Sequence, residues 1–264
     1  MARVIAITNQ KGGVGKTTTA INLGASLAVA EKRTLVIDID PQGNATSGLG
    51  VEGRANLPSV YDVLVDGKPL DEVALKGVEF PFLDLVPSNR DLVGAEVELV
   101  QMQDRERRLR KAVDAVRDRY DFILVDCPPS LGLLTLNTLG AADSVLIPIQ
   151  CEFYALEGLS QLLNTVRLVQ RGLNPKLEIE GVLLTMYDRR LNLSKQVARE
   201  AHEYFGEKVY RTAIPRNVRL AEAPSFGKPI LVYDVLSPGA QSYLRLAQEL
   251  MAKHPAAAAP EASE

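Results

Sequence analysis

The sequence predicts an α/β fold: a doubly wound, mostly parallel sheet with helices on both faces. Short, continuously apolar runs alternate with longer stretches of helical period, and continuous runs are typical of strands buried on both faces. The expected strands lie at 4–7, 34–37, 122–125, 144–147 and 181–184, and the expected helices at about 16–30, 104–119, 131–141, 155–171 and 192–205. Repeated strand–helix units of this kind are joined by right-handed crossovers.

These elements belong to one domain, because no linker long enough to divide the 264 residues is present. A last helix is expected at 238–253, where Ser237 is a suitable N-cap and Pro238 suits the first helical position. The Ala- and Pro-rich segment that follows has the composition of a disordered chain. The sequence therefore predicts a single domain over 1–253 and a disordered tail over 254–264.

The composition argues against several classes of protein. A net charge of −3 is unlike that of a uniformly basic nucleic-acid binder. The two cysteines, Cys127 and Cys151, are too few and too far apart for a disulfide framework or a C-x-x-C pair, and only two histidines are present. No stretch approaches the roughly 18 apolar residues of a membrane span. We therefore expect a cytoplasmic protein with reduced cysteines.

The strongest motif is a glycine-rich turn between the first expected strand and the first expected helix. It ends in Gly15-Lys16-Thr17, as in the phosphate-binding pattern G-x-x-x-x-G-K-[ST]. Glycines let backbone N–H groups converge on phosphate oxygens, and the helix N-terminus adds partial positive charge. Lys16 is expected to reach the β- and γ-phosphates, the Thr17 hydroxyl to ligate Mg²⁺ and Thr18 to bond the α-phosphate. The predicted nucleotide-binding residues of this turn are Lys11, Gly12, Gly13, Val14, Gly15, Lys16, Thr17 and Thr18.

The turn departs from the general pattern at its start. Gln10 stands where the first glycine belongs, and an extra lysine, Lys11, follows it. Lys11 cannot easily fold back onto phosphates that Lys16 already holds, so it points more readily toward the triphosphate of a neighbouring subunit. The alternative is an ordinary exposed lysine.

Acidic residues follow two of the expected strands. Asp38 and Asp40 come at the end of the second, and Asp126 follows the apolar run 122–125. The carboxyl ends of strands line the ligand crevice of open α/β sheets. The alternative for Asp38 and Asp40 is a strand end with solvated carboxylates. An apolar run before Asp126 is a weak signal alone, but beside the phosphate turn it indicates a Walker B aspartate.

The run K-G-G-V-G-K-T-T, Lys11 to Thr18, resembles the deviant Walker A motif of the MinD/ParA class of P-loop ATPases. The similarity extends from Arg3 to about Met251 and is greatest to chromosomal ParA (Soj) proteins. It implies that 1–253 is one P-loop ATPase domain that uses ATP/ADP and Mg²⁺. It also implies that Lys11 crosses a dimer interface to the partner's nucleotide as an arginine finger does, a contribution that can reach about 10³–10⁵ in rate.

The resemblance gives the acidic residues their roles. Asp40 would position the attacking water, which makes Lys11, Lys16 and Asp40 the catalytic set. Asp38 and Asp126 would each support Mg²⁺ through a water molecule, alongside Thr17.

The resemblance further implies that Pro215 and Asn217 contact the adenine through their backbones. Several relatives place an asparagine for the base where this chain reads Thr185-Met186-Tyr187, so no single side chain is assigned as the adenine reader.

A basic segment suggests what the nucleotide cycle controls. Residues 187–219 contain eight Lys or Arg and four acids, although the chain as a whole is acidic. A local basic surface is expected for a protein that binds the phosphate backbone of DNA. No sequence-reading DNA-binding motif accompanies it, so the contact would be non-specific, and Arg189, Arg216 and Arg219 are the candidate residues. The alternative is a solvated face of mixed charge.

The resemblance to ParA implies an ATP-driven switch for chromosome partitioning. An ATP-bound homodimer would bind DNA non-specifically, and a ParB protein would stimulate hydrolysis and release, which makes the protein nucleoid-associated. A MinD-like membrane-surface ATPase is the main alternative, but the Ala/Pro/Glu tail is unlike a basic amphipathic helix, so we expect no stable membrane binding. A cluster-carrying ATPase, like the nitrogenase iron protein, would require cysteines in other positions.

Overall fold

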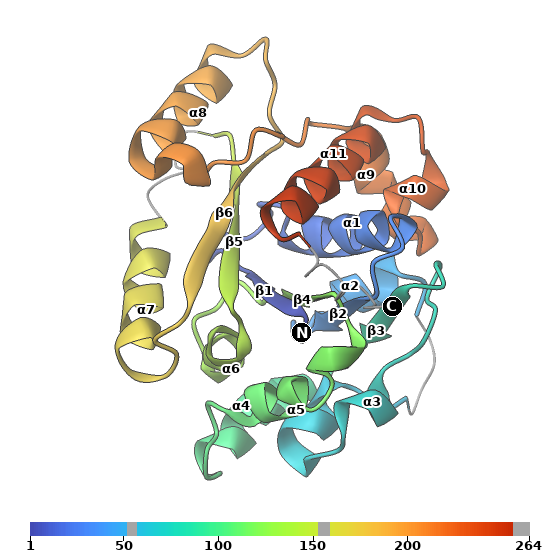
Figure 1. Cartoon of the computed structure of the whole chain (residues 1–264), viewed down its shortest axis with the longest axis vertical. Helices are drawn as coiled ribbons and strands as arrows, with labels where there is room; N and C mark the ends of the chain where they lie inside the picture. Colours follow the sequence, from blue (N-terminus) through green and yellow to red (C-terminus); the bar gives the residue numbers. More distant parts are fainter. Residues whose placement is uncertain (52–56, 153–158, 256–264) are drawn as a thin grey trace, which may run out of the picture.

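A six-stranded sheet runs through the middle of the computed structural model, which describes residues 1–51, 57–152 and 159–255 (Figure 1). Its strands are β1 (Arg3–Ile7), β2 (Thr34–Asp38), β3 (Leu83–Val86), β4 (Phe122–Asp126), β5 (Ser144–Gln150) and β6 (Glu178–Thr185). All five pairings between these strands are parallel, in the order β3-β2-β4-β1-β5-β6.

The helices within the described residues cover both faces of this sheet. They are α1 (Lys16–Val29), α2 (Asn44–Gly48), α3 (Leu70–Val73), α4 (Leu92–Val100), α5 (Arg108–Asp114), α6 (Leu133–Ala141), α7 (Leu159–Gly172), α8 (Asn192–Phe205), α9 (Val218–Glu222), α10 (Ile230–Tyr233) and α11 (Pro238–Lys253). Short π-helical or 3-10 turns occur at Asp62–Asp66, Arg117–Arg119, Gly206–Lys208 and Ala223–Phe226.

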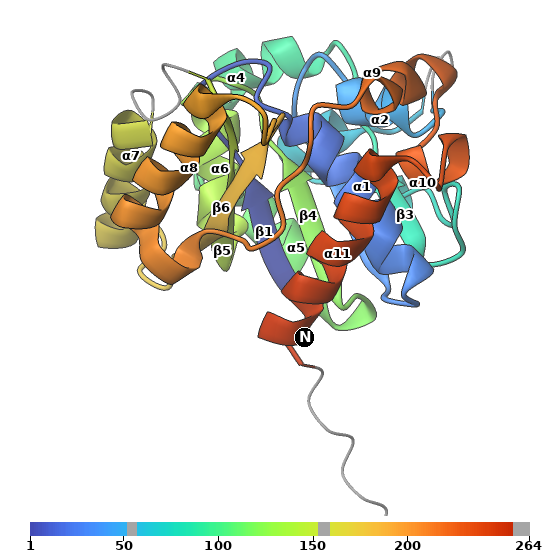
Figure 2. The same ribbon diagram turned by 90° about the horizontal axis from the view of Figure 1, so that it is seen from above.

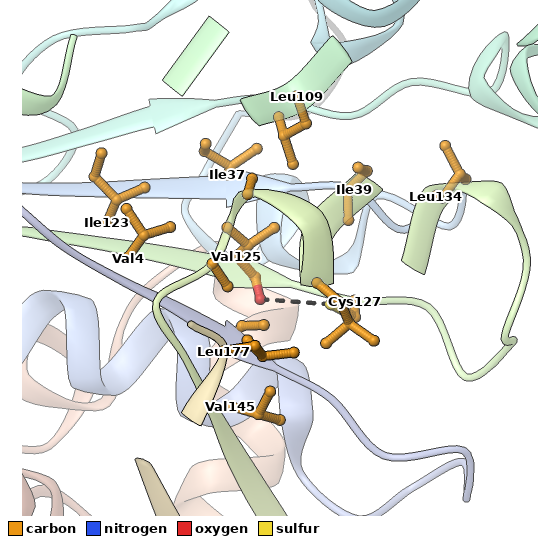
Figure 3. Packing of buried hydrophobic residues seen from close by; sticks show 14 of the residues in the cluster. Val4, Ile37, Ile39, Leu109, Ile123, Val125, Cys127, Leu134, Val145 and Leu177 are labelled. Atoms are coloured by element: carbon orange, nitrogen blue, oxygen red, sulfur yellow. Dashed lines mark hydrogen bonds between the residues drawn. The ribbon is translucent and has the colours of Figure 1, made fainter. Parts of the chain in front are cut away.

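Side-chain alternation along the buried strands builds two hydrophobic cores. Val4 and Ala6 of β1 belong to the core under α4 to α8, whereas Ile5 and Ile7 belong to the core under α1 and α11. Figure 3 shows the first of these cores, with Val4 beside the β4 side chains. Each core requires apolar side chains at alternate residues of a strand. Because the buried parts of these strands face both cores, successive residues there are apolar and the sequence shows a continuous apolar run.

The second core places α11 directly against α1 (Figure 1). The hydroxyl groups of Thr19 and Tyr243 lie 3.2 Å apart across this contact. α11 begins as expected, since the Ser237 hydroxyl accepts a hydrogen bond of 3.2 Å from the Ala240 N–H and Pro238 occupies the first turn. The chain that follows the last sheet strand thus returns to pack behind the phosphate turn.

The register of the central strands brings their carboxyl ends together. Asp126 at the end of β4 pairs with Ile7 of β1 on one side and with Asp38 of β2 on the other. Figure 2 shows α2, α4 and α9 at this edge of the molecule and the N-terminus at the opposite edge. A crevice beyond the carboxyl ends of parallel strands is where open α/β sheets bind ligands.

The five expected strands are confirmed, and the sheet adds β3. The expected helix at 104–119 is wrong in extent, because only α5 and one 3-10 turn form there. Asp104 has a left-handed φ of 52°, which interrupts helical backbone before α5. The expected helix at 131–141 begins at Leu133, and the first residues of the helix expected at 155–171 lie outside the described residues, where α7 is described from Leu159.

The start of the expected tail is held by a defined contact. His254 Nε2 lies 2.8 Å from Glu180 Oε1, and residues 256–264 lie outside the described residues. Across the described ranges, no helix is both long enough and apolar enough to cross a membrane.

Candidate nucleotide-binding site

The glycine-rich turn connects β1 to α1 in a conformation that only glycine adopts without strain. Gly13 and Gly15 have φ angles of 75° and 88°. No side chain of the described residues caps α1, so the N–H groups of its first turn remain available to an anion. The Thr185 hydroxyl, at the end of β6, donates a hydrogen bond of 2.8 Å to the Val14 carbonyl and fixes the turn from the far side.

Lys16 is buried beneath this turn. Its side-chain Nζ donates a 3.2 Å hydrogen bond to the Lys11 carbonyl, and the residue is 7% exposed. Burial lowers the pKa of Lys16, while the negative charge of Asp126 opposes that change. The ammonium is thus held at the glycine-rich turn, and among neighbouring charges Asp126 has the largest effect on it.

Lys11 has a fixed main chain and an unengaged side chain. Its N–H donates to Asn9 Oδ1 at 3.0 Å, and its carbonyl receives Lys16 Nζ. Within the part of the chain that the structure describes, its ammonium group makes no hydrogen bond and no ion pair. The loop therefore presents a positive charge that its own subunit does not use.

Asp38 and Asp126 form a buried acidic pair at adjacent strand ends. Burial, followed by the charge of Asp38, raises the pKa of Asp126 well above its usual value, and burial also raises the pKa of Asp38. Asp38 accepts hydrogen bonds from the Thr46 N–H and hydroxyl at 2.8 and 2.7 Å. Among the described residues, neither buried carboxylate oxygen of Asp126 has a partner at normal hydrogen-bond geometry, although the nearby Thr17 side chain acts to lower the pKa of this carboxyl.

This pair fits a magnesium ion that is bound through water. Two unpartnered carboxylate oxygens are costly to bury, and a hydrated cation would satisfy them. Among the described residues, no three His, Cys, Asp or Glu side chains are grouped to hold a metal by themselves. A magnesium ion here would therefore depend on the Thr17 hydroxyl and on phosphate oxygens for its direct ligands.

Asp40 lies beside this pair in the segment that leads to α2. Its Oδ1 accepts a 3.0 Å hydrogen bond from the Gln42 N–H, and the residue is 7% exposed. Its carbonyl accepts a 2.7 Å hydrogen bond from the hydroxyl of Ser88. The sequence reasoning missed Ser88 and Thr46, because they come from other segments and belong to no motif.

Cys127, which follows Asp126 in the sequence, is buried in the first core (Figure 3). Burial raises the pKa of its thiol to about 12, and its Sγ lies 3.8 Å from the Val125 carbonyl oxygen. A thiol kept protonated in this way is a poor nucleophile.

A cavity of about 360 Å³ adjoins the phosphate turn on the side where an adenine is expected. Gly15 and Thr18 form its phosphate end, and Thr185, Met186, Pro215 and Asn217 line the rest together with Tyr243. The Tyr187 N–H donates a 3.0 Å hydrogen bond to the Ile214 carbonyl, which joins residues 185–187 to the segment that contains Pro215 and Asn217. Asn217 Oδ1 caps α9 by accepting from the Leu220 N–H at 3.2 Å.

Comparison with known proteins identifies the family. Residues 2–179 match the family described as an AAA domain. The chain is 61% identical over 252 residues to the sporulation initiation inhibitor protein Soj of Bacillus subtilis, covering 96% of this chain and 99% of that protein. It is 58% identical to the chromosome partitioning protein ParA of Myxococcus xanthus, with coverage of 95% and 88%. The chain belongs to the Soj/ParA family of P-loop ATPases.

Solved structures share the fold of this Soj/ParA protein, and some of them contain an adenine nucleotide and magnesium. A Mycobacterium smegmatis structure named cobyrinic acid a,c-diamide synthase, with a bound ATP analogue and magnesium, is 37% identical and covers 94% of this chain and 93% of its own, with a TM-score of 0.81. The same M. smegmatis protein has also been solved with ADP and magnesium.

The basic segment of this Soj/ParA protein is only partly free. Arg216 pairs with Glu152 at 3.2 Å and lines the adenine-side cavity, and Arg219 pairs with Glu222 at 2.9 Å. Arg189 is exposed, and no ion pair engages it within the described ranges. Of the three arginines expected at DNA, Arg189 therefore has the most available charge.

Proposed function

We propose that this chain is a Mg²⁺-dependent ATPase, formed by a single domain over 1–253, that acts as a cytoplasmic, nucleoid-associated switch in chromosome partitioning. ATP joins two copies into a sandwich dimer, the dimer binds DNA non-specifically, and a ParB-type partner stimulates hydrolysis and release. The observation that carries the proposal is Lys11, whose main chain is held at both N–H and carbonyl while its ammonium has no hydrogen bond or ion pair with any described residue. Its place at the start of a phosphate turn that already has Lys16 supports a role at a partner's nucleotide.

The residues of the site divide the work of ATP hydrolysis. The first turn of α1 and Lys16 bind and orient the phosphates, and Asp40 orients the attacking water. The cavity beside Met186 and Pro215 encloses the base. Magnesium, when bound by Thr17 and through water by Asp38 and Asp126, neutralises charge on the phosphate oxygens.

Dimerisation would make DNA binding depend on the nucleotide. Two protomers double the number of phosphate contacts, which raises affinity by avidity and steepens its salt dependence. The test is to measure binding to unrelated DNA duplexes with ATP, with ADP and without nucleotide. We expect tight, salt-sensitive binding with ATP alone, and equal affinity in the three states would overturn the proposal.

Lys11→Ala is expected to bind ATP normally but to lose ATP-dependent dimerisation. Within the described residues its ammonium group makes no hydrogen bond or ion pair, and both main-chain hydrogen bonds survive the change. The measurement is size-exclusion chromatography with ATP and Mg²⁺ in an Asp40→Ala background, which slows hydrolysis in both proteins. The matched control is Asp40→Ala alone, and a Lys11→Ala/Asp40→Ala protein that eluted as a dimer would show that Lys11 does not act across subunits.

Arg189→Glu is expected to weaken DNA binding more than the same change at Arg216 or Arg219. Arg189 has no ion pair with any described residue, whereas the other two already interact with carboxylates. Losing one phosphate contact reduces the slope of log affinity against log salt by about 1 in each protomer. ATP affinity serves as the control, since it should change little for Arg189→Glu. A larger loss at Arg219 than at Arg189 would place the DNA surface nearer α9.

A further inference from the structure

A buried chain of hydrogen bonds connects Ser88, which follows β3, to Asp38 at the end of β2 and to Asp40 in the loop after β2. The Ser88 hydroxyl donates to the Asp40 carbonyl at 2.7 Å, and the Ser88 N–H donates to the Thr46 hydroxyl oxygen at 2.9 Å. Thr46 in turn donates its hydroxyl to Asp38 Oδ2 at 2.7 Å. Asp38 Oδ1 accepts from the Asp40 N–H at 3.2 Å, which closes the ring.

Each member of this ring has a defined direction of donation. Because the Thr46 hydroxyl accepts from Ser88, its proton is directed at Asp38. Asp38 and Thr46 are 0% and 7% exposed, and Ser88 is 8% exposed, so water competes little for these groups. Buried chains of this kind strengthen one another and favour a single arrangement of the groups they join.

The ring fixes the main chain of Asp40 rather than its carboxylate. The Asp40 N–H and carbonyl are both members, and the carbonyl also accepts from the Gly43 N–H at 2.9 Å. The carboxylate itself accepts a hydrogen bond from the N–H of Gln42, which lies two residues further along the same loop. The orientation of the carboxylate relative to the phosphate turn therefore depends on a contact from outside the loop, and Ser88 supplies it.

We propose that Ser88 and Thr46 are positioning residues for ATP hydrolysis, which hold Asp40 and Asp38 in the arrangement needed for the attack of water. The inference rests on the proposed ATPase function and adds two residues to it. Small displacements of a water-orienting group carry large rate penalties, of about 100-fold for 1 Å. Neither residue lies in the phosphate turn or the adenine-side cavity, and Asp38 would reach Mg²⁺ only through water, so we expect nucleotide affinity to change little when they are replaced.

The test is a comparison of kcat and ATP affinity for Ser88→Ala and Thr46→Val with those of the wild-type chain. We expect kcat to fall about five- to tenfold in each, with the dissociation constant for ATP changed by less than about twofold. Thr46→Ser keeps the hydroxyl and both of its hydrogen bonds, so it should retain at least about half of the wild-type kcat.

Ser26→Ala is the matched control. Its hydroxyl is equally buried and donates to the Asn22 carbonyl at 2.7 Å within α1, away from the two aspartates. It removes one buried hydroxyl hydrogen bond, as Ser88→Ala does, but should leave kcat unchanged. If Ser88→Ala or Thr46→Val is poorly folded, the Thr46→Ser variant still decides the matter, because a well-folded Thr46→Ser protein with much less than half of the wild-type kcat would overturn the hydrogen-bond explanation.

The possible failures are distinguishable. A wild-type chain that binds ATP but never hydrolyses it would refute the proposed ATPase function. A wild-type chain that hydrolyses ATP, together with Ser88→Ala and Thr46→Val proteins of unchanged kcat, would refute the positioning role alone. Equal losses of kcat in Ser88→Ala and Ser26→Ala would also refute it, since the loss would then come from general destabilisation.

Discussion

Lys16→Ala is expected to weaken ATP binding by at least about 100-fold and to stop ATP hydrolysis. The ammonium lies under the phosphate turn, and its hydrogen bond to the Lys11 carbonyl marks where a phosphate oxygen would compete for it. A single hydrogen bond to a charged group contributes about 1.5–3 kcal/mol, and Lys16 is expected to contact two phosphates. Isothermal titration with ATP and Mg²⁺ measures the loss directly.

Thermal unfolding separates this binding defect from misfolding. Burial lowers the pKa of Lys16, which means that the folded protein without nucleotide gains little from this charge. The melting temperature of Lys16→Ala without nucleotide should therefore stay near that of the wild type. ATP should raise the melting temperature of the wild type and of Lys11→Ala, because a ligand stabilises the state that binds it. A similar ATP-induced rise in Lys16→Ala would show that Lys16 is dispensable for binding.

The parts of the structure that the sequence could predict are those fixed by neighbouring residues. The glycines at 13 and 15 are required by local backbone angles, and the cap at Ser237 involves a residue three positions away. Asp38 and Asp126 were placed correctly at strand ends because the apolar runs before them are continuous. A continuous run needs only that both faces of the strand be covered, whichever helices cover them.

The parts that the sequence could not predict depend on contacts between distant segments. β3 is an edge strand, and Asp84 interrupts its apolar run. Asp84 accepts a 2.7 Å hydrogen bond from the hydroxyl of Tyr120, which follows the next helices in the sequence. The boundary of α5 is set by Asn137 of α6, which donates to the Arg105 carbonyl and accepts from the Leu109 N–H. Thr185 and Ser88 also reach the site through contacts with distant segments. They could not be predicted, because no local pattern distinguishes them from ordinary residues near a strand end.

Asp40→Ala is expected to lower the rate of ATP hydrolysis by about 10²–10⁴-fold while leaving ATP affinity within about threefold of the wild type. A positioned general base or water-orienting group contributes that much to rate, and the Asp40 carboxylate has no role in the phosphate turn itself. The measurement is phosphate release at saturating ATP, beside an equilibrium titration with ATP.

Asp40→Asn distinguishes the carboxylate's chemistry from its structural contact. The amide oxygen of asparagine can still accept the hydrogen bond from the Gln42 N–H, so the loop should keep its shape. A neutral amide cannot take a proton from water and orients it less strongly than a carboxylate. Asp40→Asn should therefore hydrolyse ATP almost as poorly as Asp40→Ala, and full activity in Asp40→Asn would mean that the loop contact, not the carboxylate, is what hydrolysis requires.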